Sequence, residues 1–199
     1  MTSSRRGRGA VPVTDADGRS DAELWILAAA GDRDAFGALF ERHVAAVWNH
    51  AYRLTASWAK AEDLTSSTFL LAWRKCPELR LVRDSALPWL FAVAGNLART
   101  EFRSSTRFLR AVRRLPGDGA EADHADAVAS RVDDGRRMPR LLDAVRELPK
   151  AERQAVELCL LGELSTTDAA ALLGVAEPSV RSRLSRARSR LRTLLEETS

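Results

Sequence analysis

Residues 164–195, LSTTDAAALLGVAEPSVRSRLSRARSRLRTLL, determine the fold class of this chain and indicate its function. Ser165, followed three residues later by Asp168, is a capping box that satisfies the free amide groups at the start of a helix. Gly174 ends that helix, because glycine adopts the left-handed conformation that a tight turn requires. Pro178 lies where the first turn of a second helix tolerates proline. The stretch therefore predicts a helix-turn-helix.

The second predicted helix has an apolar stripe and an opposite face of arginine and serine. The stripe has the spacing of one helix face and consists of Val180, Leu184, Ala187, Leu191 and Leu194. Residues 181–192 hold six arginines and no acid, which favours a DNA-binding surface over a solvated basic helix, where glutamates usually alternate with arginines. The residues predicted to contact DNA are Ser179, Arg181, Ser182, Arg183, Ser185 and Arg186.

The composition bounds the function classes. A chain of 199 residues with 45% hydrophobic content suffices for two small domains, and its net charge of +4 favours a polyanionic partner. No histidine has a carboxylate at ligand spacing, so we expect no metal site. The sequence has no catalytic triad order, glycine-rich phosphate loop or paired carboxylates in an apolar setting, so we expect no enzyme activity and no cofactor. No apolar run approaches the ~20 residues that span a bilayer, so we expect no membrane insertion.

A first helical domain is predicted over residues 21–114, after a disordered tail at residues 1–20. Trp48 and Tyr52 lie on the apolar stripe of its second helix, and we expect both in the packed interior. The third helix, residues 59–75, turns a different set of residues outward: Asp63, Ser67, Leu70 and Arg74.

The fourth helix of this domain begins near Ser85 and has a second basic surface. Its polar face consists of Asn96, Arg99, Thr100 and Arg103, at spacings of three, four and seven from the first residue. Residues 99–114 hold six arginines and one acid. On charge alone, a nucleic-acid surface and a solvated face are equally compatible with this pattern.

An acidic linker separates this domain from the helix-turn-helix. Residues 116–135 hold six acids and one arginine with few large apolar residues, and we place the linker at residues 115–137. Helical periodicity resumes at Arg140, after a proline, and the second domain is predicted over residues 138–199. The predicted fold is therefore all-α, with two small helical domains joined by a flexible acidic linker.

Five segments, in this order, resemble the extracytoplasmic-function (ECF) sigma factors of bacterial RNA polymerase. They are DRDAFGALFERH, AEDLTSSTFLLAW, LPWLFAVAGNLARTEFR, LPKAERQAVELCLLGELSTTDAAALLGV and SVRSRLSRAR. The resemblance covers about residues 21–195. It implies a sigma region 2-like domain, a sigma region 4-like domain, and a function in promoter recognition and transcription initiation.

The resemblance also implies a role for each surface. The third helix would bind core RNA polymerase through Asp63, Ser66, Ser67 and Arg74. The fourth helix and the loop before it would open and recognise the minus-ten promoter element as single strands, through Asn96, Arg99, Arg103 and Arg107. The helix-turn-helix would recognise the minus-thirty-five element as duplex. Further implied are an anti-sigma partner, a monomer when free, and a location in the cytoplasm at the bacterial nucleoid.

The sequence departs from the family pattern at three places, and one alternative stays open. Ser66 and Ser67 replace a Gln-Glu pair, and Thr100 replaces an acid, while Ser185 stands where a larger side chain occurs. The alternative is a stand-alone helix-turn-helix regulator whose first domain senses a ligand or dimerises, and which binds a palindrome without polymerase.

Overall fold

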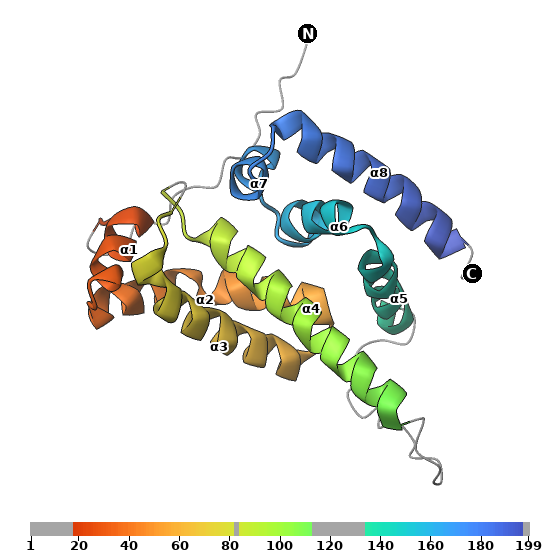
Figure 1. The fold of residues 1–199 in the computed structure, drawn as a ribbon, viewed down its shortest axis with the longest axis horizontal. Coiled ribbons are helices and arrows are strands. Elements are labelled where there is room, and N and C mark those ends of the chain that lie inside the picture. The colour runs from red at the N-terminus through yellow and green to blue at the C-terminus, as the bar shows by residue number, and fades with distance from the viewer. Residues whose placement is uncertain (1–17, 82–83, 113–133, 197–199) are drawn as a thin grey trace.

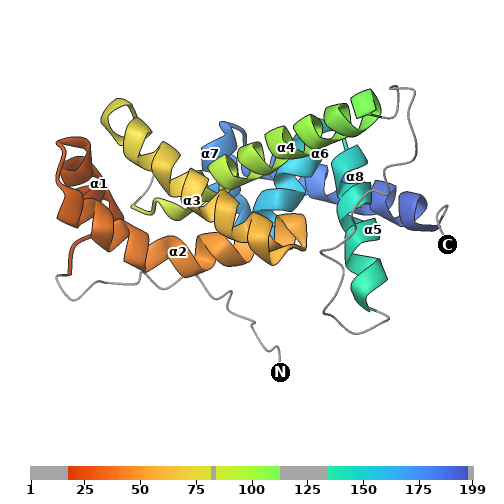
Figure 2. The ribbon, with the colours of Figure 1, turned by 90° about the horizontal axis from the view of Figure 1, so that it is seen from below.

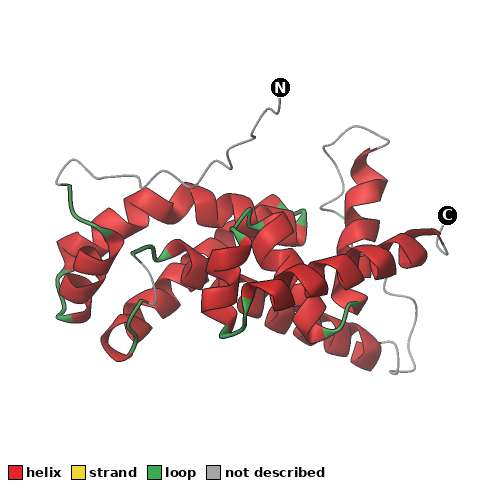
Figure 3. Cartoon of the chain, turned by 90° about the horizontal axis from the view of Figure 1, so that it is seen from above, coloured by secondary structure: helices red, strands yellow, loops and turns green. Residues whose placement is uncertain are grey.

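The computed structural model describes residues 18–81, 84–112 and 134–196, and at 105–112 and 134–137 it describes the backbone alone. All regular secondary structure in these residues is helical (Figure 3), and none of their helices is long and apolar enough to span a bilayer. Residues 1–17 of the predicted disordered tail and residues 115–133 of the predicted linker lie outside the described residues. The end of the tail prediction is wrong, because Ser20 caps α1. The elements are α1 (Asp21–Ala29), α2 (Arg33–Thr55), α3 (Trp58–Lys75), the 3-10 helix η1 (Cys76–Glu78), α4 (Leu87–Val112), α5 (Asp134–Glu147), α6 (Lys150–Val156), the π-helical turn η2 (Glu157–Leu161), α7 (Thr166–Leu173) and α8 (Glu177–Glu196).

Polar side chains fix where the N-terminal helices begin. Ser20 and Glu23 form a capping box at the start of α1. The Asp32 carboxylate accepts two backbone amides at the start of α2, and Ser57 caps α3. These caps set the lengths of helices that then pack through their apolar faces.

Elements α1 to α4, with η1, form the N-terminal helical group. Helix α2 packs against α1, α3 and α4 (Figure 1). Its buried residues Leu39 and Val47 share one core with Phe69 of α3 and Leu90 of α4. This burial of one apolar face per helix stabilises the group.

The prediction that Tyr52 lies in the packed interior is wrong. Tyr52 is 42% exposed and stacks against Trp48, with ring centroids 5.4 Å apart. Trp48 is half-buried and also meets the edge of Trp58 at 4.5 Å. Tyr52 lies in the last turn of α2, where the Trp48 ring covers one of its faces and solvent reaches the rest. The apolar stripe therefore continues past the end of the core.

Elements α5 to α8, with η2, form the C-terminal helical group, in which α6 and α7 pack against α8. The predicted stripe of α8 is confirmed, because Val180, Leu184, Ala187 and Leu191 are buried and Leu194 packs half-buried against the same core. Gly174 has the left-handed conformation, with φ +63°, that the predicted turn requires. The helix-turn-helix therefore forms as the sequence predicts.

Helix α5 begins earlier than the sequence predicts. It starts at Asp134 and not at Arg140, and Pro139 lies inside it. Proline lacks an amide hydrogen and removes one backbone hydrogen bond from a helix interior. The helix continues through that position, so the proline does not mark its start.

The two helical groups contact each other through α2 and α4 on one side and η2 and α7 on the other (Figures 1 and 2). His50 of α2 is buried and stacks on Phe91 of α4, with centroids 4.3 Å apart. Burial lowers the pKa of His50 to about 4, so this imidazole is neutral at pH 7. A Cβ built on Gly162, just after η2, would lie 2.8 Å from the Phe91 ring. The groups therefore meet at a close-packed contact that requires glycine.

We expect Gly162→Ala to lower the free energy of unfolding by about 1–3 kcal/mol, because the added methyl group would clash with the Phe91 ring and with the Leu158 carbonyl oxygen at 2.6 Å. Chemical denaturation monitored by circular dichroism measures this. Gly37→Ala is the matched control, because a Cβ there meets nothing within 4 Å. Alanine is the better helix former, so we expect the control to be neutral or stabilising. Equal effects of the two substitutions would contradict the contact.

Candidate nucleic-acid interface

The predicted DNA-contacting residues of α8 lie on its outward face, at its N-terminal half. The exposed ones are Ser179, Arg181, Ser182, Ser185 and Arg186. Arg183 is half-buried beside them. Because the opposite stripe is buried against the rest of the group, this face is presented by a fixed scaffold. It combines short hydroxyl side chains with long guanidinium groups, which suits contact with base edges and phosphates.

Glu177 joins the two helices of the helix-turn-helix. Its carboxylate accepts the Thr166 hydroxyl at 2.8 Å and the Thr167 hydroxyl at 3.2 Å, both from the start of α7. It also pairs with Arg181 at 2.5 Å. The hydrogen bonds from Thr166 and Thr167 and the Arg181 charge lower the pKa of Glu177. Arg181 is therefore held near the turn when DNA is absent.

Glu152 of α6 is a buried acid that supports the basic face of α8. Its carboxylate oxygens lie 3.5 Å from Arg186 Nε and 3.0 Å from Arg190 Nε. A buried carboxylate needs such partners, because its desolvation is costly without them. The sequence analysis missed this residue, because a single glutamate in a helix gives no signal of burial.

The predicted polar face of α4 is only partly exposed. Asn96 and Arg103 are exposed, but Arg99 is half-buried. Its guanidinium group pairs with Glu157 of η2 at 2.9 Å and also bonds the Asn96 side chain. The side chain of Arg107 lies outside the described residues. The contact of Arg99 therefore reaches from one helical group to the other.

Glu157 is the second buried acid that the sequence analysis missed. Burial raises the pKa of Glu157 to about 7, although the charges of Arg99 and Arg153 oppose this shift. Gly95 of α4 makes room for the carboxylate, since a Cβ at that position would lie 3.2 Å from Glu157 Oε2. The Glu157 side chain of η2 therefore packs against α4 at Gly95, beside the predicted nucleic-acid face.

A cavity of about 520 Å³ lies between the two helical groups next to this ion pair. Apolar residues of α2, α4 and α5 form part of its wall. Its cationic lining residues are Lys60, Arg99, Arg103, Arg146 and Arg153. The predicted α4 surface thus faces the C-terminal helical group.

The outward face of α3 is exposed as predicted. Its polar residues are Asp63, Ser66, Ser67 and Arg74. Leu70 lies among them and is 59% exposed. Helix α3 lies on the other side of α4 from α6 and α8 (Figure 1), and these residues are exposed while the two groups are in contact.

Two family models match this chain, each within one helical group. Sigma-70 region 2 matches residues 39–108, and sigma-70 region 4 matches residues 139–191. The ECF sigma factor SigL of Mycobacterium tuberculosis is 37% identical over 176 residues, covering 85% of this chain and 94% of SigL. The chain belongs to the ECF sigma factors. BldN, an ECF sigma factor of Streptomyces coelicolor, is 32% identical and covers 94% of this chain and 70% of BldN.

Solved sigma factor structures agree with this assignment. CnrH, in complex with the cytosolic domain of CnrY, superimposes with a TM-score of 0.61 at 25% identity, over 91% of this chain and all of CnrH. RpoE of Bartonella quintana, in complex with the anti-sigma factor NepR, gives a TM-score of 0.51 at 27% identity, over 79% of this chain and 94% of RpoE.

The family assignment decides between the two interpretations left open by the sequence. This ECF sigma factor directs promoter recognition and transcription initiation by RNA polymerase. The match to region 2 covers the part of the chain that a stand-alone regulator would use for sensing or dimerisation. The predicted all-α fold is likewise confirmed.

At pH 8, above the pKa of about 7 at Glu157, we expect Glu157→Gln to weaken the contact between the two helical groups, because it leaves Arg99 and Arg153 without their charged partner. Small-angle X-ray scattering should then give a larger radius of gyration than for the wild-type sigma factor. The matched control is Glu163→Gln, which removes an ion pair with Arg53 that also joins the groups but is solvent-exposed. An unchanged radius for Glu157→Gln would show that the ion pair does not hold the groups together.

Proposed function

We propose that the outward face of α8 recognises the minus-thirty-five element as duplex DNA. The observation that supports this most directly is the exposed arginine and serine face opposite a largely buried apolar stripe. A helix presented in this way enters the major groove with its N-terminal residues toward the bases. When the helix binds DNA, Arg181 would leave Glu177 and Arg186 would leave Glu152, and both would contact DNA instead.

The polar face of α4 would bind the minus-ten element after its strands separate. Unstacking a base costs a few kcal/mol, which stacking and hydrogen bonds on the protein recover. Asn96, Arg99 and Arg103 offer an amide and two guanidinium groups for that purpose, and Arg107 would extend the surface along the helix. Arg99 first has to leave Glu157, so strand capture and separation of the helical groups are linked.

The outward face of α3 would bind core polymerase. Asp63 offers a charge and Leu70 an exposed apolar side chain, a combination suited to a protein interface. The side chains of Ser66 and Ser67 are short, so Asp63 and Arg74 would make the contacts that extend furthest from the helix. The face differs in character from α8, because it is not uniformly basic.

Simultaneous binding of both promoter elements requires the helical groups to separate. The two elements are centred about 25 base pairs apart, or about 85 Å at 3.4 Å per step. Arg99 and Glu157, one from each group, are 2.9 Å apart. The ~20 residues between α4 and α5 can span at most about 70 Å. This length, added to the dimensions of the two groups, is enough to bridge the distance between the two promoter elements. The proposed domains at 21–114 and 138–199 correspond to this division, except that α5 already begins at Asp134.

The remaining assignments follow from the family. Complexes of related sigma factors with CnrY and NepR support an anti-sigma partner for this chain. The sigma factor would act as a monomer until it binds polymerase, in the cytoplasm at the nucleoid. It would contribute no catalytic residue, because polymerase carries out the chemistry.

We expect Arg181→Ala and Arg186→Ala each to weaken minus-thirty-five recognition by about 1–3 kcal/mol, because each removes a guanidinium group aimed at the groove. Holoenzyme binding to promoters with and without the element measures this. Arg192→Ala is the control, since it removes the same charge from an exposed position beyond the predicted contacts. A loss that is equal on both promoters would indicate phosphate contact in place of base recognition.

We expect Asp63→Ala to weaken binding to core polymerase about tenfold while leaving duplex DNA binding unchanged, because Asp63 is on α3 and not on α8. Fluorescence anisotropy with purified core measures the affinity. Glu41→Ala is the control, since it removes an exposed acid from α2. Full core affinity in the Asp63 variant would exclude this face as the polymerase interface.

A further inference from the structure

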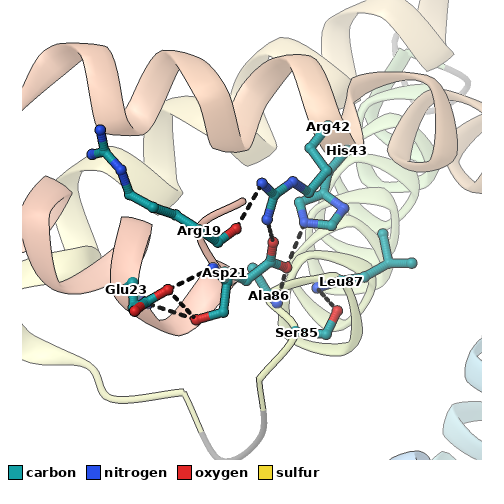
Figure 4. Close-up of polar contacts among 9 residues, drawn as sticks. Arg19, Asp21, Glu23, Arg42, His43, Ser85, Ala86 and Leu87 are labelled. Carbon is teal, nitrogen blue, oxygen red and sulfur yellow. Dashed lines mark hydrogen bonds and ion pairs between the residues drawn. The ribbon is translucent and has the colours of Figure 1, made fainter. Parts of the chain in front are cut away.

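Helix α1 holds both ends of the segment that connects α3 to α4. Trp25 donates its indole N–H to the Leu79 carbonyl oxygen at 3.0 Å, directly after η1. The Asp21 carboxylate accepts the Ala86 amide at 2.8 Å, directly before α4 (Figure 4). Asp21 and Trp25 are one helical turn apart and only 4% and 3% exposed. One face of α1 therefore fixes where the connection leaves α3 and where α4 begins.

The Asp21 carboxylate is fully engaged in this contact. Oδ1 accepts Arg42 Nη1 at 2.6 Å, and Oδ2 lies 2.6 Å from His43 Nε2 as well as accepting Ala86 (Figure 4). Although burial works to raise it, the bonds from His43, Ala86 and Arg42 lower the pKa of Asp21 to about 2. A buried anion at this place thus ties α1, α2 and α4 together.

Formation of α1 does not require the hydrogen bonds from Trp25 to Leu79 and from Ala86 to Asp21. Ser20 and Glu23 already cap α1, and the Trp25 ring is packed edge-on against Trp89 at 5.4 Å without help from its N–H. The indole N–H and the carboxylate serve backbone atoms 54 and 65 residues away. Their specific effect is on the position of the connection and of α4.

We propose that Asp21 and Trp25 are positioning residues for discrimination of the minus-ten sequence. This inference rests on the proposed function of the α4 face. Arg103 lies about 25 Å along the helix from Ala86, at 1.5 Å per residue. A tilt of about 5° at the start of α4 would therefore move that side chain by about 2 Å, which is enough to break a hydrogen bond to a base. Accurate base recognition accordingly depends on how the start of α4 is held.

The test uses Trp25→Phe, which keeps a buried ring against Trp89 and removes the N–H that Leu79 accepts. Holoenzyme is reconstituted from the full chain and core polymerase. Initiation is then compared between promoters selected by the wild-type sigma factor from a randomised minus-ten library and single-base variants of them. For Trp25→Phe, we expect the ratio of initiation on the preferred promoter to initiation on the disfavoured promoter to fall about five- to tenfold toward unity. The affinity for core polymerase should stay within twofold of wild type. Asp21→Asn should lower the ratio in the same direction.

A ratio is used because loss of folded protein lowers initiation on all promoters equally and cancels. Ser20→Ala is the matched control, since it weakens the start of α1 without contact to the connection, and its ratio should stay at the wild-type value. An equal fall in this control would overturn the proposal, because α1 stability alone would then explain the effect. Arg103→Ala separates this inference from the proposed function. If it impairs minus-ten use while Trp25→Phe and Asp21→Asn keep the wild-type ratio, the positioning role is wrong and the α4 role stands. If Arg103→Ala also has no effect, the α4 role itself fails.

Discussion

Three buried carboxylates each bind two basic side chains of this sigma factor. Asp21 meets Arg42 and His43, Glu152 meets Arg186 and Arg190, and Glu157 meets Arg99 and Arg153. Taking a carboxylate out of water is costly unless it is paired and hydrogen-bonded. Each of these acids therefore joins its own helical element to at least one other through its basic partners. The arrangement lets arginine-rich helices pack closely where their charges alone would separate them.

The same pairing links structure to DNA binding. A guanidinium group satisfied by a carboxylate is satisfied equally well by a phosphate, since both accept two parallel hydrogen bonds. Arg99 and Arg186 are paired with acids in the free protein and are proposed to contact DNA in the complex. Under this proposal, DNA would compete with Glu157 and Glu152 for these groups. Part of the binding energy of DNA is offset by breaking pairs that already exist, which disfavours weak, nonspecific sites.

Local features of the fold could be predicted from the sequence, because they depend on residues close together in the chain. The Ser165 cap, the left-handed Gly174 and the α8 stripe follow from spacing and side-chain chemistry. The long-range pairs could not be predicted, because helical period carries no information about a partner 58 residues away, as for Arg99 and Glu157. For the same reason the outward faces of α3 and α8 were recognisable, whereas the partial burial of Arg99 on the α4 face was not.

The position of the three proposed interfaces sets an order for initiation. The α3 face is exposed while the helical groups are in contact, so core polymerase can bind this closed form without opening it. The α4 face is partly covered at Arg99 and Glu157, where His50 and Phe91 pack nearby and His50 is neutral at pH 7. Promoter capture, in contrast, needs both groups apart by tens of ångströms. The proposed interfaces therefore permit polymerase docking before the groups separate, whereas strand capture through Arg99 would require its contact with Glu157 to break first.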